Sequence, residues 1–434
     1  WMTAVDDIDP AWVQALWQAW RKAFGTPSTH WAWHPYTASE RVTNILSFAR
    51  AYGLPGPLDD TLSVLAGHAP AIAVKLEYFG DHHTSNHLAN NGMGLYFLGL
   101  MLDMENTAAI GLRILLEEAG RIILPSGVLR EGSSHYHLLV LALYQKAAEL
   151  ASACGRPEAV DLSAICEKMK GPARALLLPG GLPLIGDISP DISPEKLLAG
   201  LDLEPAPAAE LMVADGWLRF DQGPWSGLWH ASPEGFTHMP GHGHQDMGGF
   251  ELHHGNEPVL VDPGRGAYGE TGEAAQYRSA EAHNGLSIDG GDPYPANRPY
   301  YDATFRKHIA GTPPVLTALA DGVSLRYQKE KTGEHLRQWS FSGDRMTIRD
   351  DLTGTGKHRI VRRLISPLAA ESSDGKVILQ GQEKTYRLDC EGAEISLQPI
   401  TCWRAYGQGA AGSMIVFSNH QSLPFQGVLS MEVL

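Results

Sequence analysis

The sequence lacks the features that mark several large classes of protein. It has only four cysteines, and no two of them have the CxxC spacing of a zinc ribbon or a redox pair, so we expect free thiols. No stretch approaches the roughly 18 consecutive apolar residues of a membrane-spanning helix, and no basic-then-apolar leader opens the chain as given. We therefore expect no membrane span and no signal peptide within these residues. No Gly-rich phosphate loop, repeat or low-complexity tract is present.

Basic residues are outnumbered, which argues against a nucleic-acid partner. The chain has 34 Lys and Arg against 49 Asp and Glu, a formal net charge of −15, and no long basic block offsets that balance. Such a surface repels a phosphate backbone on average. The same sign opposes any polyanionic ligand, so a site for one must concentrate Arg, Lys and His locally.

The length and the periodicity predict two domains. At 434 residues the chain exceeds the size at which one hydrophobic core keeps growing. From residue 9 to 178 the apolar pattern is helical. Asp9 and Pro10 suit an N-cap and a first turn, and Thr37 and Glu40 have the spacing of a capping box. Further helices are expected over 58–79, 85–103, 105–123, 133–153 and 157–177, with short connections that favour antiparallel neighbours.

The pattern changes after Leu178. A proline-rich stretch with the composition of a linker follows, and from Leu211 onward the apolar residues alternate with a period of two. Short runs separated by turns, typical of a large antiparallel β-sandwich, occur at 217–220, 227–230, 258–261, 286–288, 323–327, 339–341, 346–348, 360–364, 377–379 and 414–417. The predicted fold class is multidomain α + β, with an all-α domain over residues 1–205 and a β-sandwich domain with a metal site over 206–434.

The metal prediction depends on histidines and one aspartate in the second domain. His244, Asp262 and His283 form a set of two imidazoles and a carboxylate, which suits Zn²⁺ at about 2.0–2.2 Å and leaves a fourth position for water. We expect His242 and His244 on one face of a strand, where the intervening glycine lets the backbone approach closely. One imidazole can then bind the metal while the other faces a substrate. The alternative is that these histidines only satisfy core hydrogen bonds. His253 and His254 compete for the ligand role.

Two segments of the helical half contain candidate polar residues. In Ser85–Asn91, Asn86 and Asn90 lie one helical turn apart, and neutral amides can hold a carboxylate or sugar hydroxyls. Capping of the helix by Ser85 or Asn86 is the simpler alternative. Farther along, Tyr136 follows Arg130-Glu-Gly-Ser-Ser-His. It lines up with Leu139, Val140 and Leu143, so a core tyrosine is the alternative there.

Taken together, these motifs resemble the heparinase II/III-like polysaccharide lyases. The resemblance spans roughly residues 80 to 290, and its motifs are Asn86-His87, Glu131-Gly-Ser-Ser-His-Tyr136, Leu184-Ile-Gly-Asp187, His242-Gly-His244-Gln-Asp246, Phe250-Glu-Leu252, Val261-Asp-Pro-Gly264, Arg278-Ser and Ala282-His-Asn284. It implies an N-terminal (α/α) toroid, a C-terminal antiparallel β-sandwich and a substrate cleft. The helical part is shorter than the family's usual toroid, so an incomplete toroid is one expectation.

The chemistry that this resemblance implies is β-elimination at a uronic acid. The C5 proton is removed, the C4 oxygen is expelled, and the sugar carboxylate must be neutralised meanwhile. By resemblance Asn86 holds the carboxylate, with His87 beside it. Tyr136 is the general acid and, in a syn elimination, also the base, whereas His87 or His242 is the base in an anti elimination. The residues expected to bind substrate are Asn90, Glu131, His135 and Arg278.

The resemblance also implies a structural Zn²⁺ held by His244, Asp262 and His283, and a periplasmic or secreted location. A zinc hydrolase is the competing prediction, because bound water at an open coordination position becomes a nucleophile. A non-catalytic sugar-binding protein is the third, with Trp225, Trp229 and Tyr268 stacked on sugars. Glycosaminoglycan, alginate and glucuronate-containing exopolysaccharide all remain as candidate substrates. Among them, the sequence favours a polymer that carries carboxylates and no sulfate. The sequence leaves open the oligomeric state and the choice between endo and exo cleavage.

Overall fold

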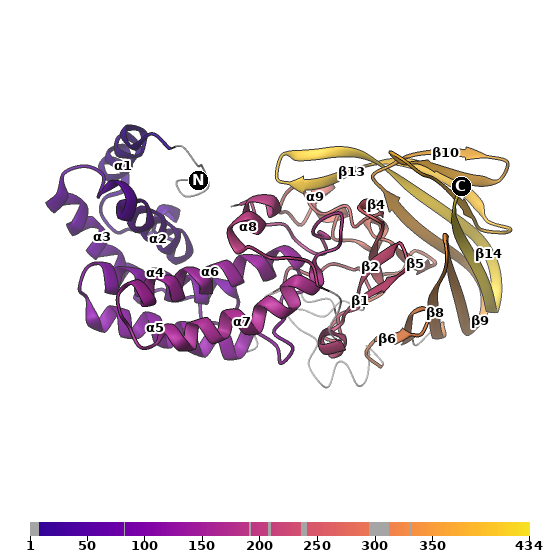
Figure 1. Ribbon diagram of the computed structural model, residues 1–434, viewed down its shortest axis with the longest axis horizontal. Coiled ribbons are helices and arrows are strands. Elements are labelled where there is room, and N and C mark those ends of the chain that lie inside the picture. Colours follow the sequence, from indigo (N-terminus) through magenta and orange to yellow (C-terminus); the bar gives the residue numbers. More distant parts are fainter. Residues whose placement is uncertain are drawn as a thin grey trace. The chain divides into compact units, whose positions relative to one another are not determined.

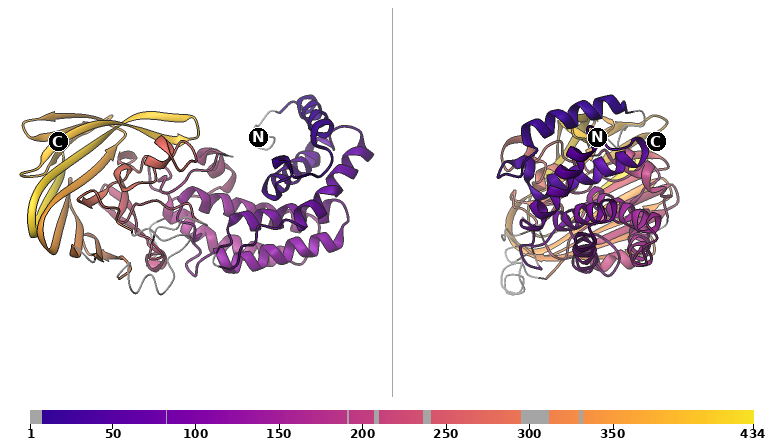
Figure 2. Two further views of the ribbon diagram at one scale, coloured as in Figure 1. Left: turned by 180° about the vertical axis from the view of Figure 1, so that it is seen from behind. Right: turned by 90° about the vertical axis from the view of Figure 1, so that its left-hand side faces the viewer.

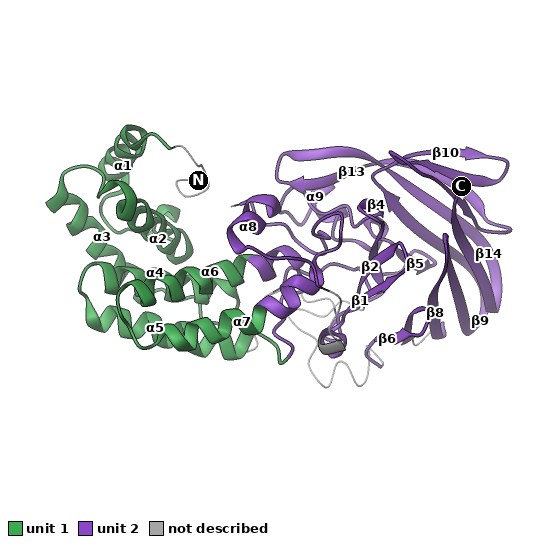
Figure 3. Ribbon diagram, viewed as in Figure 1, with its two compact units in different colours: residues 1–125, 139–169 green, residues 126–138, 170–434 purple. Residues whose placement is uncertain are grey.

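The computed structural model describes residues 8–81, 83–190, 192–206, 210–235, 241–294, 312–329 and 332–434. The chain forms two compact units, one of residues 1–125 with 139–169 and the other of residues 126–138 with 170–434 (Figure 3). The predicted boundary between residues 205 and 206 lies where helices give way to strands. The units divide elsewhere, after residues 125, 138 and 169, and the last two of these breaks lie inside helices, so the helical half contributes residues to both units.

The expected helices are present in the helical half (Figure 1). They are α1 Pro10–Phe24, α2 Pro35–Tyr52, α3 Leu58–Ala73, α4 Asn86–Met101, α5 Glu105–Ile122, α6 Ser134–Ala153 and α7 Ala159–Leu176. Asp9 is the N-cap of α1, as predicted, and its side chain accepts a hydrogen bond from the Ala11 amide. Gly53 ends α2 at a φ of 81°, a conformation that glycine adopts without strain.

Two local predictions in this half were wrong. The predicted capping box does not form, because α2 already begins at Pro35 and Thr37 and Glu40 lie inside it. The stretch expected to be a linker contains the helix α8, Pro194–Leu201, and the Ser193 hydroxyl caps it by accepting a hydrogen bond from the Lys196 amide. Both helices begin with a proline, Pro35 in α2 and Pro194 in α8. Proline is favoured at the first position of a helix, although it breaks a helix in the interior.

The second half consists of antiparallel strands. A four-stranded sheet has the order β1-β2-β3-β4, and a ten-stranded sheet has the order β10-β11-β12-β14-β9-β8-β7-β6, with β13 paired to β14 and β5 to β9. Their bounds are β1 Trp217–Gln222, β2 Trp225–His230, β3 Gly249–His254, β4 Glu257–Leu260, β5 Gly285–Ile288, β6 Val315–Leu319, β7 Gly322–Lys329, β8 Gly333–Ser342, β9 Arg345–Ser366, β10 Ala369–Ser373, β11 Lys376–Gln380, β12 Thr385–Asp389, β13 Glu394–Ala405 and β14 Gln408–Val433. Short helical turns occur at η1 Trp31–Trp33, η2 Glu210–Asp215, α9 Gly272–Gln276 and η3 Ala280–Ala282.

One hydrophobic core joins the two sheets. Trp229 and Phe250 of the small sheet pack with Trp339 of the large sheet, with the two tryptophan rings 5.8 Å apart edge to face. The fold class predicted from the sequence is confirmed: toroid-type helices precede an antiparallel β-sandwich. The runs 346–348 and 360–364, predicted as separate strands, belong to the single strand β9, which lies beside β14 over much of its length (Figure 2).

No helix in the described part of the chain is both long and apolar enough to cross a membrane. All four cysteines are free thiols. Cys166, Cys390 and Cys402 are buried, whereas Cys154 is exposed.

Candidate active site

A buried carboxylate, Asp187, lies at the centre of the predicted cluster in the second unit. Its Oδ2 lies 3.1 Å from His242 Nδ1, and its Oδ1 lies 2.9 Å from His244 Nε2. The same Oδ1 accepts a hydrogen bond of 2.7 Å from Arg265 Nη1. The two imidazoles of the His-Gly-His motif thus share one acidic partner, which fixes the orientation of both rings.

Three backbone segments meet closely around this carboxylate. The Asp187 amide donates to the His242 carbonyl at 2.7 Å, and the His242 amide donates to the Glu131 carbonyl at 2.8 Å. Gly186 has a φ of 81°, and a Cβ there would lie 2.5 Å from the Gly132 carbonyl oxygen, so only glycine fits. The predicted strand around His242 is wrong, because residues 241–245 form no strand. The close approach occurs at Gly186 rather than at Gly243.

Tyr136 and His242 form a stacked pair. The two rings are 3.6 Å apart with an interplanar angle of 15°. Tyr136 lies in the first turn of α6, where its amide donates to Ser133 Oγ at 3.1 Å. On the opposite side from Asp187, His242 Nε2 lies 3.3 Å from Glu131 Oε2. Tyr136 is buried, as its core-tyrosine alternative requires, but its neighbours are polar and titratable.

The hydroxyl of Tyr136 is hydrogen-bonded to the hydroxyl of Tyr268. The Tyr268 ring is 45% exposed and lies 5.4 Å from the guanidinium carbon of Arg265. Partial burial, followed by the neighbouring Tyr136 and Asp187, raises the pKa of Tyr268 far above its ordinary value. Tyr268 therefore stays protonated and is suited to donate a hydrogen bond to the Tyr136 oxygen.

The loop that presents Tyr268 packs against the β13–β14 hairpin. The Trp403 amide donates to the Pro263 carbonyl at 2.7 Å. A Cβ on Gly266 would lie 2.4 Å from the Trp403 indole, so this position accepts only glycine. Tyr406, in the hairpin turn, meets the Tyr268 ring edge to face at 5.6 Å. The C-terminal third of the chain thus supports the loop, although it contains no recognisable motif.

Opposing effects act on the Asp187 carboxyl. Burial alone would raise its pKa, but the hydrogen bonds from His242 and His244 outweigh that effect and hold the pKa well below the usual range. Arg265 is also almost fully buried, and its charge compensates that of Asp187. The ion pair leaves this part of the cluster close to neutral.

The predicted zinc ligands lie near one another. His283 Nδ1 is 2.7 Å from Asp262 Oδ2, and the rings of His244 and His283 are 5.1 Å apart. His244 Nδ1 and His283 Nε2 are buried without a hydrogen-bond partner, which leaves both nitrogens available as metal donors. No group of three or more His, Cys, Asp or Glu side chains in the described residues is arranged to hold a metal ion. The donor types fit zinc, but the three residues do not form a preformed ligand set.

Of the two competing histidines, His253 is already engaged. Its Nε2 pairs with Glu251 at 2.9 Å, and its Nδ1 accepts from the Gly180 amide at 3.1 Å. His254 lies beside Asp344, with 3.6 Å between His254 Nε2 and the carboxylate. The core-hydrogen-bond alternative therefore describes His253.

The residues predicted to bind substrate in this unit are mostly buried. His135 accepts from the Ser189 amide through Nδ1, and burial, followed by the charge of His242, lowers the pKa of His135 to about 4. Arg278 pairs with Glu270 at 2.9 Å. Substrate contact by these two residues stays a prediction, and their burial favours a positioning role instead.

Asn86, His87 and Asn90 lie at the start of α4 in the first unit. Ser85 is the N-cap and accepts from the His87 amide, so the capping alternative is correct for Ser85 and not for Asn86. Asn86 and Asn90 are buried, and the Asn90 amide donates to Glu40 Oε1. The roles of the three predicted residues in substrate binding and catalysis stay predictions.

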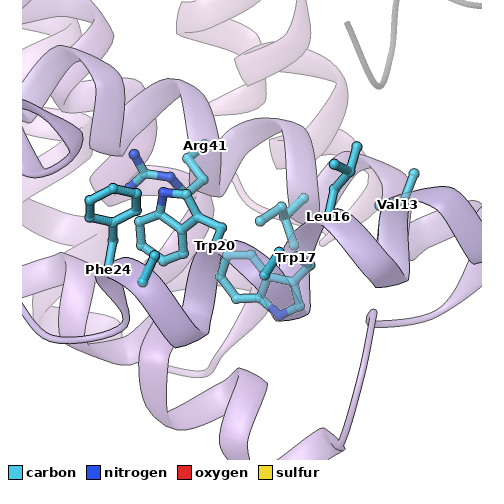
Figure 4. Close-up of a pocket in the computed structure, with 9 residues that line it drawn as sticks. Val13, Leu16, Trp17, Trp20, Phe24 and Arg41 are labelled. Atoms are coloured by element: carbon cyan, nitrogen blue, oxygen red, sulfur yellow. The ribbon is translucent and has the colours of Figure 1, made fainter.

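A separate cavity of about 540 Å³ lies along α1 in the first unit (Figure 4). Its lining is apolar and aromatic apart from Arg41, whose guanidinium carbon lies 4.0 Å from the Trp20 ring centroid. None of the predicted site residues lines it.

Three residues of the polar cluster were not predicted to have these roles. They are Asp187, Arg265 and Tyr268. Asp187 left two signals in the sequence: it ends the motif Leu184-Ile-Gly-Asp187 of the family resemblance, and it is a lone carboxylate inside the apolar run Leu184–Ile188. Trp225 and Trp229, expected to stack on sugars if the protein only binds them, are buried in the core, which removes them from that role.

The conserved-domain model for heparinase II/III-like proteins, C-terminal, matches residues 204–426, about half of the chain. The chain belongs to the heparinase II/III-like family. This confirms the resemblance drawn from the motifs. No curated protein sequence matches the chain.

Solved structures agree with this family assignment at the level of fold. Heparinase III, the BT4657 gene product, is 18% identical with a TM-score of 0.71, covering 98% of this chain and 74% of that one. The heparan sulfate lyase HepC from Pedobacter heparinus is 15% identical with a TM-score of 0.64, covering 98% and 72%. The chondroitin AC lyase of Streptomyces coelicolor A3, in complex with chondroitin sulphate, is 9% identical with a TM-score of 0.56, covering 98% and 70%.

Proposed function

We propose that this heparinase II/III-like protein is a polysaccharide lyase that cleaves a uronic-acid-containing polysaccharide by β-elimination to give unsaturated oligosaccharides. The observation that supports it most is the Tyr136 phenol, stacked on His242 and hydrogen-bonded to Tyr268. Because its partner is a protonated phenol, the Tyr136 hydroxyl can lose its proton and later regain it. A general acid that protonates a leaving oxygen must be able to do this.

In the proposed reaction a base removes the C5 proton of the uronate, and the C5–H electrons form the C4=C5 double bond. The C4–O bond breaks, and its electron pair stays on the oxygen of the departing sugar. Tyr136 donates its proton to that oxygen. Tyr268 then stabilises the phenolate by a hydrogen bond, an effect that favours the charged form.

The negative charge of the sugar carboxylate must be neutralised before the C5 proton becomes acidic. We assign Asn86 to hold it, since an amide N–H can donate to a carboxylate oxygen. The base is Tyr136 in a syn elimination, and His87 or His242 in an anti elimination.

We propose a carboxylate-only bacterial exopolysaccharide as the substrate, ahead of a sulfated glycosaminoglycan. The net charge of −15 opposes dense sulfate. In the described part of the cluster, Arg265 and Arg278 already pair with Asp187 and Glu270. Such a polymer lies outside the cytoplasm, so we also propose a periplasmic or secreted location.

The test is incubation of the purified protein with glucuronate exopolysaccharide, heparan sulfate, chondroitin sulfate and alginate. A lyase raises ultraviolet absorbance as the conjugated double bond forms, in step with new reducing ends. A hydrolase releases reducing ends without that absorbance, and a sugar-binding protein changes neither. Either of these last outcomes contradicts the proposal.

We also propose that His244, Asp262 and His283 hold one structural Zn²⁺. The ion would supply electrostatic cross-linking of the segments that carry these residues. Asp187 supports the assignment, because its bond to His244 Nε2 leaves Nδ1 as the nitrogen available for a metal, in the manner of a carboxylate that orients a ligating imidazole.

Protein purified without chelator is expected to contain about one equivalent of zinc per chain, and chelation is expected to lower its Tm, because a ligand held only by the folded state stabilises it. Elemental analysis and thermal denaturation measure the two effects. His283→Ala should lose the zinc, whereas the exposed His420→Ala should keep it. Metal-free protein with a Tm that is insensitive to chelator would contradict the assignment.

A further inference from the structure

Two buried arginines of the ten-stranded sheet share one buried aspartate, on strands β8 and β9 of the second unit (Figure 1). Arg337 of β8 lies opposite Asp350 of β9, with 3.2 Å between Arg337 Nε and Asp350 Oδ1. Arg362, farther along β9, donates from Nε to Asp350 Oδ2 at 2.6 Å. The three side chains are at most 3% exposed. Each guanidinium group therefore contacts its own oxygen of a single carboxylate, away from water.

The charges of this cluster do not balance. Among the described residues, Asp350 is the one carboxylate that contacts either guanidinium group. Arginine stays protonated in a folded protein, so two positive charges face one negative charge. A buried charge without a compensating partner is strongly unfavourable. The cluster therefore needs one further negative charge.

The other titratable side chains beside the cluster do not supply that charge. Burial raises the pKa of Cys390, whose Sγ lies 3.8 Å from Arg362 Nη1, so this group is a neutral thiol. Burial also raises the pKa of Tyr327, which keeps its phenol neutral. His335 is uncharged as well, because burial, followed by the charge of Lys329, lowers its pKa to about 4. The excess of one positive charge thus remains.

Both guanidinium groups also have an unused hydrogen-bond donor. Arg337 Nη2 and Arg362 Nη2 are buried, and neither has a hydrogen-bond partner in the part of the chain that the structure describes. Aromatic rings lie beside the two groups: the Arg337 guanidinium carbon is 5.3 Å from the Trp339 ring centroid, and that of Arg362 is 5.5 Å from the Phe425 ring centroid. Since buried polar groups are nearly always hydrogen-bonded, the two donors indicate a place for an acceptor.

We propose that Arg337 Nη2 and Arg362 Nη2 bind one monovalent inorganic anion, of the charge and size of chloride, inside the β-sandwich. A halide accepts a hydrogen bond from each guanidinium group, and its single charge makes the cluster neutral. Phosphate and sulfate carry more charge than the cluster lacks, and they are larger than an enclosed site of this kind accommodates. The bound ion links β8 to the second half of β9 and stabilises the folded sheet.

Water is the alternative occupant, because it also accepts hydrogen bonds. Water has no net charge, so it satisfies the two donors and leaves the excess positive charge in place. The two occupants therefore differ in one measurable property. Only a bound anion makes the stability of the protein depend on which anion the buffer contains.

The first test is thermal denaturation of the whole chain after dialysis into sodium gluconate, with chloride then added at constant ionic strength. An ion that binds only the folded state raises Tm, and we expect a rise of about 3 °C that levels off when the site is filled. Bromide should reproduce the rise, whereas gluconate is too large to enter. A Tm that does not rise with chloride overturns the inference.

A pair of variants assigns the effect to the cluster. Arg337→Met removes one positive charge and leaves Asp350 and Arg362 as a neutral pair, so the rise in Tm with chloride should be lost. Arg326→Met is the matched control, because Arg326 lies on the neighbouring strand β7 with its side chain 60% exposed. This control should respond to chloride as the normal protein does. An Arg337→Met variant with an undiminished response overturns the inference.

Bromide also gives a readout that needs no variant. Crystals of the normal protein grown in sodium bromide should show an anomalous scattering peak within hydrogen-bonding reach of both Nη2 atoms. A water molecule gives no such peak, so a site without anomalous signal overturns the inference. Neither Tm nor anomalous scattering depends on turnover, and the result therefore stands apart from the lyase function proposed above.

Discussion

Tyr136→Phe is expected to lower kcat by about 10³-fold, the middle of the range for removal of a general acid or base. The change deletes only the phenol oxygen, so the ring should still stack on His242 at 3.6 Å and the fold should be kept. KM should change little, because the lost proton transfer occurs in the transition state. Initial rates from the absorbance of the unsaturated product measure both constants.

Two further variants make this result specific. Tyr268→Phe removes the partner hydroxyl and should cost about 10-fold, the effect of losing one hydrogen bond to the reacting group. Tyr52→Phe, at an exposed site on α2, should leave kcat unchanged. Full turnover by Tyr136→Phe would reject Tyr136 as the acid.

Asp187→Ala is expected to have the largest effect on stability. Removal of one partner from a buried ion pair costs about 3–5 kcal/mol, because the other charge is left uncompensated. The charge left without a partner is that of Arg265, whose side chain is 2% exposed. His242 and His244 lose their shared hydrogen-bond acceptor as well. Chemical denaturation, followed by tryptophan fluorescence, measures the loss in the free energy of unfolding.

Asp187→Asn should be intermediate, since an amide oxygen can still accept a hydrogen bond but has no charge. Asp59→Ala, at an exposed position in the first turn of α3, should change the free energy of unfolding by less than about 1 kcal/mol. If Asp187→Ala were as stable as Asp59→Ala, the ion pair with Arg265 would contribute nothing to the fold.

Local sequence signals predicted the helices well. Helix α4 was expected from residue 85 and begins at Asn86, because Ser85 caps it and apolar residues follow at every turn. Such signals act within a few residues, so they can be read from sequence alone. The two strand segments that form β9 show the limit. Their polar middle resembled a turn, but β9 pairs with β14 on both sides of that middle and stays one strand.

The sequence predicted several residues of the candidate site but not which residues they are hydrogen-bonded to. Tyr136 and His242 were both singled out, but Asp187, which orients His242, comes from a loop that the chain order places far from it. Tyr268 resembled a surface aromatic and proved to be a hydrogen-bond partner. These pairings depend on how the loops of the β-sandwich fold back, and periodicity contains no information about that.

The contact of Trp403 with the loop that carries Tyr268 has a consequence for how the family can diversify. Because Gly266 leaves no room for a side chain beside the indole, the length and twist of the β13–β14 hairpin are constrained by the residues proposed to transfer the proton. Insertions that would be harmless at an ordinary exposed turn should here alter turnover. Natural variants with a different C-terminal hairpin are therefore the place to look for lyases with an altered rate on the same polymer.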